Sequence, residues 1–277
     1  MKIQIIIPIF NPQVSFGKEI IPLLQKQTIS SSCLIINSGT DDIVVPNSEV
    51  LKISKGNFNH ANTRNLALNY EADFYLFMTQ DAMPYNEFLI ENLLKAFEDS
   101  DVVVAYARQI PYEGSNAIEV FARNTNYPSI SIVKSKDDLP TMGIKTFFSS
   151  DSCAMYRATY FRDIGGFKKD LCTNEDMEFA ARAIMDGKKI AYMAEAKVYH
   201  SHHFTYKEIW KRYQTIGKFF SENKWILEEV SKYSKAESTG LKQAINELKY
   251  LLKKSPFDIP RSCLYSCLKF VAFKSKF

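Results

Sequence analysis

No stretch of this sequence approaches the roughly 18 to 20 consecutive apolar residues that a membrane-spanning helix needs. The first apolar run stops at Pro8 and no small-residue cleavage site follows, so we expect a strand there and not a signal peptide. Internal repeats and low-complexity segments are also lacking. The first two absences argue against a helical membrane protein and a secreted precursor. We therefore expect a globular protein that is soluble or peripheral to a membrane.

Cysteine is scarce, and its spacing argues against a zinc site or a disulfide framework. The five cysteines are odd in number and lack the paired spacing that binds zinc. We expect reduced thiols, as in cytosolic proteins. They are Cys33, Cys153, Cys172, Cys263 and Cys267.

The excess of positive charge is small, at a formal net +4, but it is unevenly distributed. Lysine and arginine become dense after Lys207, whereas the first third of the chain carries both signs. No recognised nucleic-acid-binding motif accompanies this basic region, so we expect no nucleic-acid partner. An anionic membrane surface suits the region better.

The 277 residues suffice for one large α/β domain with an appendage, or for two small domains. Apolar runs alternate with helical patterns over most of the chain, which predicts a mainly parallel sheet with helices on both faces. From Thr205 onward the pattern is helical, so we divide the chain into 1–204 and 205–277. Strands are predicted at 3–9, 33–36, 50–54, 74–78, 102–105, 149–156 and 189–193, and helices at 16–27, 61–71, 88–97, 116–123 and 176–186.

An acidic triplet follows a glycine turn and opens a predicted helix. Glu175, Asp176 and Glu178 come after Gly165 and Gly166. A carboxylate at a helix N-terminus keeps a low pKa and stays ionised, which suits a catalytic base. The alternative is that these acids are ordinary residues of a first helical turn.

Asp81 and three histidines form a candidate metal site. Asp81 follows an apolar strand and precedes a proline, where its carboxylate could bind a hard cation or simply form an Asx-turn. On an extended strand His200 and His202 project from one face and His203 from the other. They could ligate the same ion, or they could belong to a polar surface strand.

Polar groups that could bind a nucleotide gather at the predicted carboxyl edge of the sheet. They include Asn11, the turn from Asn37 to Asp42, and Asp81. A further glycine turn leads through His60 into a helix that carries Arg64. An arginine near a helix N-terminus suits a diphosphate or a carboxylate, although Arg64 could instead pair with a neighbouring acid and His60 could be structural.

Taken together, seven motifs in order resemble family 2 glycosyltransferases of GT-A fold over residues 3 to 220. Three of them, Phe58-Asn59-His60, Thr79-Gln80-Asp81-Ala82 and His200-Ser201-His202, are similar to bacterial rhamnosyltransferases that build O-antigen, capsule or rhamnan chains. The resemblance implies an α/β fold with a Rossmann-like mixed sheet flanked by helices and a helical C-terminal extension. The other motifs are Ile6 to Asn11, the Asn37 to Asp42 turn, Ile164-Gly165-Gly166-Phe167 and Glu175-Asp176.

The resemblance also assigns roles to residues. It makes Asp176 the general base with Glu175 beside it, and Asp81 the surviving second acid of a metal-binding Asp-x-Asp element in which Thr79 replaces the first. Asp81, His200 and His202 would hold Mg²⁺ or Mn²⁺. Asn37 stands where an aspartate usually reads the pyrimidine ring. The residues implied to bind the donor are Pro8, Asn11, Asn37, Ser38, His60, Arg64, Gln80 and Asp81.

The implied activity is metal-dependent, inverting transfer of L-rhamnose from dTDP-rhamnose to a growing, lipid-linked cell-surface polysaccharide. The implied location is the cytoplasmic side of the bacterial cell membrane, with homo-oligomers possible. Alternatives are transfer of another hexose from a UDP-sugar, a non-catalytic protein that binds sugar nucleotides or scaffolds an assembly, and a metallohydrolase built on the three histidines. The intact Glu175-Asp176 pair argues against the non-catalytic alternative.

The last two segments of the chain mix apolar and basic residues at helical spacing. They are Lys242 to Lys254 and Arg261 to Phe277. This pattern predicts interfacial amphipathic helices at a membrane. Helices packed on the catalytic domain or on a partner subunit are the alternative.

Overall fold

The structure is a computed structural model that describes residues 1–202, 204–233 and 239–277. His203, whose side chain was predicted to point away from those of His200 and His202, lies outside the described residues. Among the residues described, no helix combines the length and the apolar character that crossing a membrane requires.

The chain divides into two compact units, and neither is continuous in sequence. The predicted division between residues 204 and 205 stays a prediction. The second unit also includes residues before that point, namely 110–128, 137–146 and 201–204. The first unit comprises 1–109, 129–136 and 147–200, and the second comprises 110–128, 137–146 and 201–277.

A mixed sheet organises the first unit, as the resemblance implies. The β1, β2, β3 and β4 strands are parallel, whereas β8 runs antiparallel to β4 and to β6, and β5 and β7 run antiparallel to β9. The expectation of a mainly parallel sheet is therefore wrong beyond β4, because an apolar run marks a buried strand without giving its direction. In the order of the sheet, the described strands are β3 (Glu49–Lys52), β2 (Ser32–Asn37), β1 (Ile3–Ile9), β4 (Phe74–Met78), β8 (Cys153–Arg157), β6 (Val102–Ile110), β9 (Lys189–Tyr199) and β5 (Met83–Pro84), with β7 (Ile132–Lys134) beside β9.

Two helices begin within one residue of their predicted starts at 61 and 116, and an asparagine caps each of them. The Asn62 N–H donates to Asn59 Oδ1 at the start of α2, and the Glu119 N–H donates to Asn116 Oδ1 at the start of α4. The predicted strand at 149–156 starts only at Cys153, because residues 149–150 have no regular structure and residues 151–152 form a turn. The α-helices are α1 (Ile21–Gln25), α2 (His60–Arg64), α3 (Leu89–Leu94), α4 (Ala117–Asn126), α5 (Leu139–Met142), α6 (Ala158–Asp163), α7 (Glu175–Met185), α8 (Tyr206–Glu222), α9 (Lys224–Ser231), α10 (Thr239–Lys254) and α11 (Ile259–Lys274).

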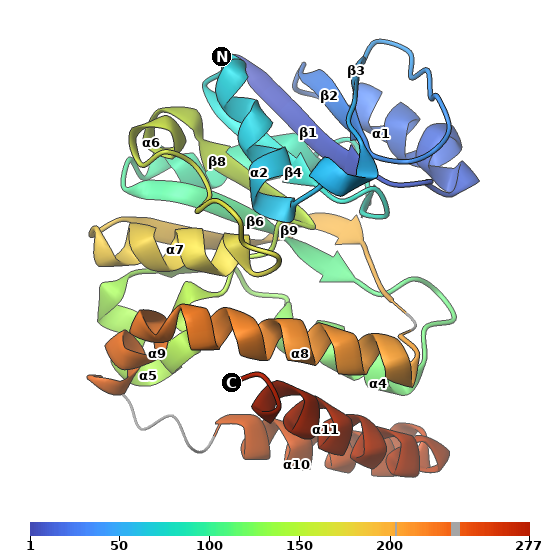
Figure 1. The fold of residues 1–277 in the computed structure, drawn as a ribbon, viewed down its shortest axis with the longest axis vertical. Helices are drawn as coiled ribbons and strands as arrows, with labels where there is room; N and C mark the ends of the chain where they lie inside the picture. The colour runs from blue at the N-terminus through green and yellow to red at the C-terminus, as the bar shows by residue number, and fades with distance from the viewer. Residues whose placement is uncertain (203, 234–238) are drawn as a thin grey trace. The chain divides into compact units, whose positions relative to one another are not determined.

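Figure 1 shows α6 and α7 beside the sheet. An aromatic cluster holds them there. The rings of Phe77 on β4 and Tyr156 on β8 lie 5.2 Å apart, and Phe161 on α6 stacks on Phe179 of α7 at 5.3 Å. Phe167 contacts Phe161 at 5.0 Å. Edge-on and stacked rings add to the free energy gained by burying their area. The cluster therefore fixes α7, whose first turn carries the acidic triplet.

The glycine turn between α6 and α7 supports a prediction about stability. Gly165 and Gly166 have φ of +75° and +76°. A Cβ at Gly166 would lie 2.5 Å from Asn65 Oδ1, which accepts the Phe167 N–H, whereas nothing lies within 4 Å of a Cβ at Gly165. We expect Gly165→Ala to lower the free energy of unfolding by about 1 to 2 kcal/mol through backbone strain alone. Gly166→Ala should cost more. Urea unfolding of both variants tests this, and equal losses would contradict it.

The second unit is a helical assembly with its own apolar core. Ile118, Ile209, Leu251 and Tyr265 are buried together. A capping box between Thr205 and its N3 glutamate starts α8. The apolar side chains of α8 that recur at helical spacing are buried or half-buried; they are Trp210, Tyr213, Ile216, Phe219 and Phe220. A Cβ at Gly217 would lie 2.3 Å from the Phe273 carbonyl oxygen. The α8 and α11 helices therefore pack at close range.

Candidate active site

Asp176 has a fixed carboxylate at the start of α7. Its Oδ1 accepts the Met177 N–H at 2.7 Å, and its Oδ2 accepts the Asp151 N–H at 3.2 Å. The second bond joins α7 to the turn before β8. The same turn contacts the chain at the end of β4, where the Thr79 N–H donates to the Ser152 carbonyl oxygen at 3.2 Å. The predicted base and the segment that carries Asp81 thus share one edge of the sheet.

A buried ion network lies next to Asp176. Arg64 Nη1 donates to Glu175 Oε1 at 2.7 Å, and Arg64 Nε lies 3.5 Å from Asp151 Oδ2. Asp151 Oδ1 accepts the Tyr156 hydroxyl at 2.6 Å. Because Arg64 is buried and bonded to Glu175, a direct contact with a diphosphate would require this pair to break. The side chain geometry is that of an arginine paired with a neighbouring acid.

His60 borders the same network. Its Nδ1 lies 3.2 Å from Arg64 Nη1 and 4.0 Å from Glu175 Oε1, while about half of its side chain stays exposed. Its ring also contacts Phe58 edge-on. His60 is therefore held at the rim of the network and remains a candidate for contact with a ligand.

The pKa of Asp176 differs from the sequence-based expectation. Burial and the negative charge of Glu175 raise it to about 6, against the two backbone N–H groups and Arg64, which lower it. The expected low pKa is therefore wrong, because desolvation and a neighbouring charge outweigh the helix terminus. A base with a pKa near 6 is still mostly ionised at neutral pH, and it accepts a proton more readily than an ordinary aspartate.

Asp151 is a site residue that the sequence reading missed. Burial raises its pKa well above the usual range, and the charges of Asp176 and Glu175 raise it further against the lowering effect of Arg64. Three carboxyl groups thus share one guanidinium. The sequence predicts that Asp151 belongs to a strand, and only the turn at 151–152 brings it to Asp176.

Asp81 and His200 are the two predicted metal ligands that lie within the first unit. His200 Nε2 is 3.5 Å from Asp81 Oδ1. The other ring nitrogen, Nδ1, is 2.8 Å from Gln109 Oε1, and Gln109 Nε2 donates to Ser150 Oγ at 2.8 Å. This arrangement makes Nδ1 the protonated nitrogen and leaves a lone pair on Nε2 beside a carboxylate. Such a pair of donors fits a divalent cation, with Gln109 orienting the imidazole.

His202 is the remaining predicted metal ligand, and Thr79 stands where the resemblance leads one to expect an acid. His202 lies two residues beyond His200, at the start of the second unit, and stays a predicted ligand. Thr79, at the position of the missing acid, has a buried hydroxyl with no hydrogen-bond partner among the described residues. Its hydroxyl does not replace the lost carboxylate charge.

A hollow of about 500 Å³ lies at the carboxyl ends of β1, β2 and β3. Phe10 offers an exposed ring there, and Lys55 Nζ lies 4.8 Å from the centre of that ring. Lys52 Nζ donates to Asp42 Oδ1 at 3.1 Å. These three side chains were not predicted as site residues. The hollow is lined by Phe10, Ser38, Gly39, Thr40, Lys52, Ile53, Ser54 and Lys55.

The residues of this edge that were predicted to bind the nucleotide sugar mainly shape the turn beside the hollow. Asn37 uses both ends of its amide, accepting the Gly39 N–H and donating to the Asp41 carbonyl oxygen, each at 2.8 Å. Asn11, at φ +42°, accepts the Thr40 N–H at 3.0 Å. A role of Asn37 in reading the base would require one of its two bonds to change.

Two more residues that were predicted to bind the nucleotide sugar form hydrogen bonds with β1 or with the residue just after it. Ser38 Oγ donates to the Ile9 carbonyl oxygen at 3.0 Å, and Gln80 Oε1 accepts the Phe10 N–H at 2.7 Å. Pro8 lies within β1, in register with Ile36. These contacts connect the hollow with the segment that carries Asp81.

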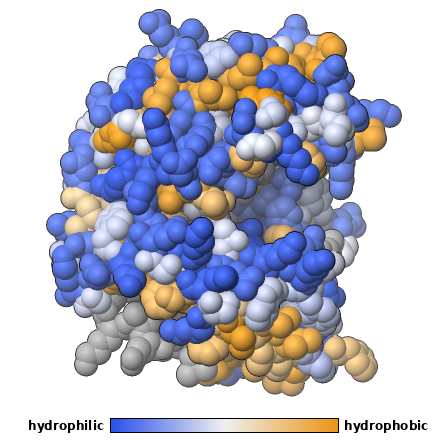
Figure 2. All heavy atoms as spheres, in the orientation of Figure 1, coloured by the Kyte–Doolittle hydropathy of each residue, from blue (hydrophilic) through white to orange (hydrophobic). Residues whose placement is uncertain are grey.

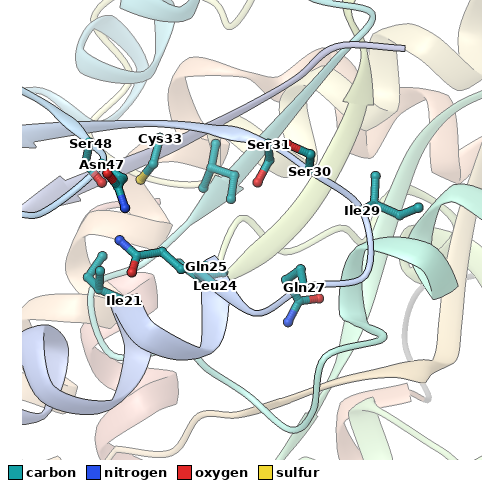
Figure 3. Close-up of a pocket in the computed structure, with 11 residues that line it drawn as sticks. Ile21, Leu24, Gln25, Gln27, Ile29, Ser30, Ser31, Cys33, Asn47 and Ser48 are labelled. Carbon is teal, nitrogen blue, oxygen red and sulfur yellow. The ribbon is translucent and has the colours of Figure 1, made fainter.

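A second hollow, of about 180 Å³, lies between α1 and β2 (Figure 3). Its lining comes from the early and middle parts of the strands, such as Ile5 and Cys33, and not from their carboxyl ends. Cys33 is its only titratable lining residue, and burial raises the pKa of that thiol to about 11. It offers no ionised nucleophile at neutral pH.

Comparison with known proteins gives one family match and two full-length relatives. A model described as glycosyl transferase family group 2 matches residues 89–230. The O-antigen chain rhamnosyltransferase RfbN of Salmonella typhimurium is 39% identical, with 99% of this chain and 89% of that protein covered. The O-antigen chain rhamnosyltransferase WbaN of Salmonella anatum is also 39% identical, with 98% of this chain and 87% of that protein covered.

Solved structures show the same fold at low sequence identity. The mannosyltransferase PcManGT of Pyrobaculum calidifontis, solved with GDP-Man and Mn²⁺, has a TM-score of 0.63 at 12% identity and covers 99% of this chain and 86% of that one. S. aureus TarS 1–349 in complex with UDP has a TM-score of 0.56 at 16% identity, and the match covers 100% of this chain and 90% of that one.

Proposed function

Because this chain belongs to glycosyl transferase family group 2, we propose that it transfers L-rhamnose from dTDP-rhamnose to the growing lipid-linked chain of a cell-surface polysaccharide. The two Salmonella relatives are named O-antigen chain rhamnosyltransferases, which supports both rhamnose as the sugar and a polysaccharide chain as the acceptor. The observation that carries the reaction is Asp176, a carboxylate with a raised pKa held by two backbone N–H groups.

The proposed reaction is a single displacement with inversion at the anomeric carbon. The acceptor hydroxyl attacks that carbon, Asp176 takes the hydroxyl proton, and the bond to the nucleoside diphosphate breaks. Glu175 is engaged by Arg64, so its carboxylate is less suited to take the proton. Arg64 and Asp151 are positioning residues that hold the first turn of α7 and the turn before β8 together.

We propose that Asp81 and His200 hold a divalent cation, with His202 as a further ligand. When bound, the cation would supply positive charge to the departing diphosphate. The imidazole in the donor set suits Mn²⁺ better than Mg²⁺, because Mg²⁺ prefers oxygen ligands in near-octahedral geometry. Gln109 fixes the tautomer of His200 that can ligate.

The hollow beside Phe10 is the proposed site of the nucleotide. An exposed ring suits stacking against a pyrimidine, and Lys52 and Lys55 bring positive charge to a dianionic ligand. Asn11, Asn37 and Ser38 shape the adjoining turn. A UDP-hexose donor remains the competing assignment, because these groups do not single out thymine.

A panel of nucleotide sugars tests the donor and the metal together. With purified protein and Mn²⁺ we expect binding and slow hydrolysis of dTDP-rhamnose in preference to UDP-glucose and UDP-galactose. EDTA should abolish the hydrolysis, and Mn²⁺ should restore it better than Mg²⁺. Asp81→Ala should lose the response to metal, whereas Asp163→Ala, which removes an exposed acid at the end of α6, should keep it. Preference for a UDP-sugar would overturn the proposal that dTDP-rhamnose is the donor. Turnover that EDTA leaves unchanged would overturn the proposal that a divalent cation takes part.

The acceptor also suggests a location. We propose that the protein works on the cytoplasmic side of the bacterial cell membrane as a peripheral protein. A lipid-linked acceptor is confined to the bilayer, so the enzyme must reach its surface.

A further inference from the structure

The α10 and α11 helices carry an apolar surface that the second unit leaves uncovered. Figure 2 shows apolar side chains gathered over this region, at the lower right of the view. Phe257, in the connection between the two helices, is 97% exposed, and Leu252 at the end of α10 is 62% exposed. Soluble proteins seldom leave so many large apolar side chains together in water.

The exposed residues of α11 follow helical periodicity. They recur at spacings of three and four, which places them on one face of the helix. The opposite face is buried in the second unit through Ser262, Tyr265 and Ala272. The exposed face consists of Pro260, Cys263, Leu264, Cys267, Phe270 and Val271.

Positive charge accompanies this face. Between residues 243 and 277 the chain has seven lysines and arginines against two acids. Lys253 and Lys254 end α10, Lys274 ends α11 and Lys276 follows it; all four are exposed. The two acids, Glu247 and Asp258, accept hydrogen bonds from Ser262 and Ser255. An apolar face with cationic flanks is complementary to a bilayer that contains anionic lipid.

We propose that the α10–α11 hairpin docks on an anionic lipid bilayer, with Leu252, Phe257, Leu264, Phe270 and Val271 in the interface and the flanking lysines among the headgroups. The proposal deepens the membrane part of the proposed function and does not depend on the donor or on Asp176. A second copy of the chain is a poorer occupant, because two such faces would bring their lysines together.

Vesicle flotation of the full-length protein tests this surface. We expect binding to phosphatidylcholine vesicles that contain phosphatidylglycerol, and weak binding to phosphatidylcholine alone. Phe257→Ser with Phe270→Ser should weaken binding about tenfold or more. Lys253→Gln with Lys254→Gln should weaken it about thirtyfold on the anionic vesicles only. The matched control is Val44→Ser with Ile130→Ser, which removes equally exposed apolar side chains from the first unit.

The cysteines give an independent readout of which surface is covered. Cys172, Cys263 and Cys267 are all exposed, but only the last two lie on the α11 face. Anionic vesicles should slow alkylation of Cys263 and Cys267 by a bulky maleimide and leave Cys172 unchanged. Equal binding to both vesicle types, or no binding, would overturn the proposal. So would protection of Cys263 and Cys267 that needs no vesicles and grows with protein concentration, which would indicate a second copy.

Discussion

Asp176→Asn is expected to lower kcat/KM for sugar transfer by about 10² to 10⁴ while donor binding persists. The amide keeps the shape of the carboxylate but cannot take the acceptor proton. Its oxygen can still accept one of the two N–H bonds from Met177 and Asp151. Donor affinity measured by calorimetry should therefore change little, and the loss should appear in kcat.

Two variants bracket this result. Asp163→Asn removes an exposed carboxylate at the end of α6 and should leave transfer unchanged. Glu175→Gln should cost less than Asp176→Asn, because Glu175 is bonded to Arg64 and acts through it. Near wild-type turnover by Asp176→Asn, or a larger loss in Glu175→Gln, would show that Asp176 is not the base.

Arg64→Met is expected to damage both the fold and the pH dependence. It leaves Glu175 and Asp151 buried without their cation, and breaking a buried pair in this way costs about 3 to 5 kcal/mol of unfolding free energy. Arg64 also lowers the pKa of Asp176, so without it that pKa should rise above about 6. Since the base must be ionised, the acidic limb of the pH profile of kcat/KM should move to higher pH.

Arg64→Lys serves as the control for this experiment. It retains the charge while losing the fork that reaches both acids, so its acidic limb should stay near that of the native protein. A contact between Arg64 and the donor diphosphate predicts something different. In that case Arg64→Met would raise KM for the donor and leave the acidic limb in place, which would contradict the positioning role.

The sequence predicts most of the elements of the first unit because their signals are local. The run Ile3–Ile9 and the run Phe74–Met78 are strands as predicted, and α2 and α4 begin within one residue of the predicted starts at 61 and 116. The resemblance to family 2 glycosyltransferases and the mixed α/β fold are confirmed. Strand direction is not local, and for this reason the antiparallel part of the sheet was missed.

The site was predicted less completely, because several of its residues meet only through contacts between distant parts of the chain. Asp176 and Asp81 belong to short motifs that can be read along the chain. Asp151 and Gln109 become site residues only through contacts with Asp176 and His200 that span 25 and 91 positions. The raised pKa of Asp176 likewise depends on burial, which its place at a helix start does not reveal. The metal ligands and the donor residues stay predictions.

The most direct test of the account is the stereochemistry of the product. The purified protein would be given dTDP-rhamnose with a β anomeric centre, Mn²⁺ and a short lipid-linked glycan, and the new linkage would be determined by NMR. We predict an α-linked rhamnose that forms with the native protein and is lost with Asp176→Asn. A β-linked product, or transfer that does not need Asp176, would contradict the single displacement and its base.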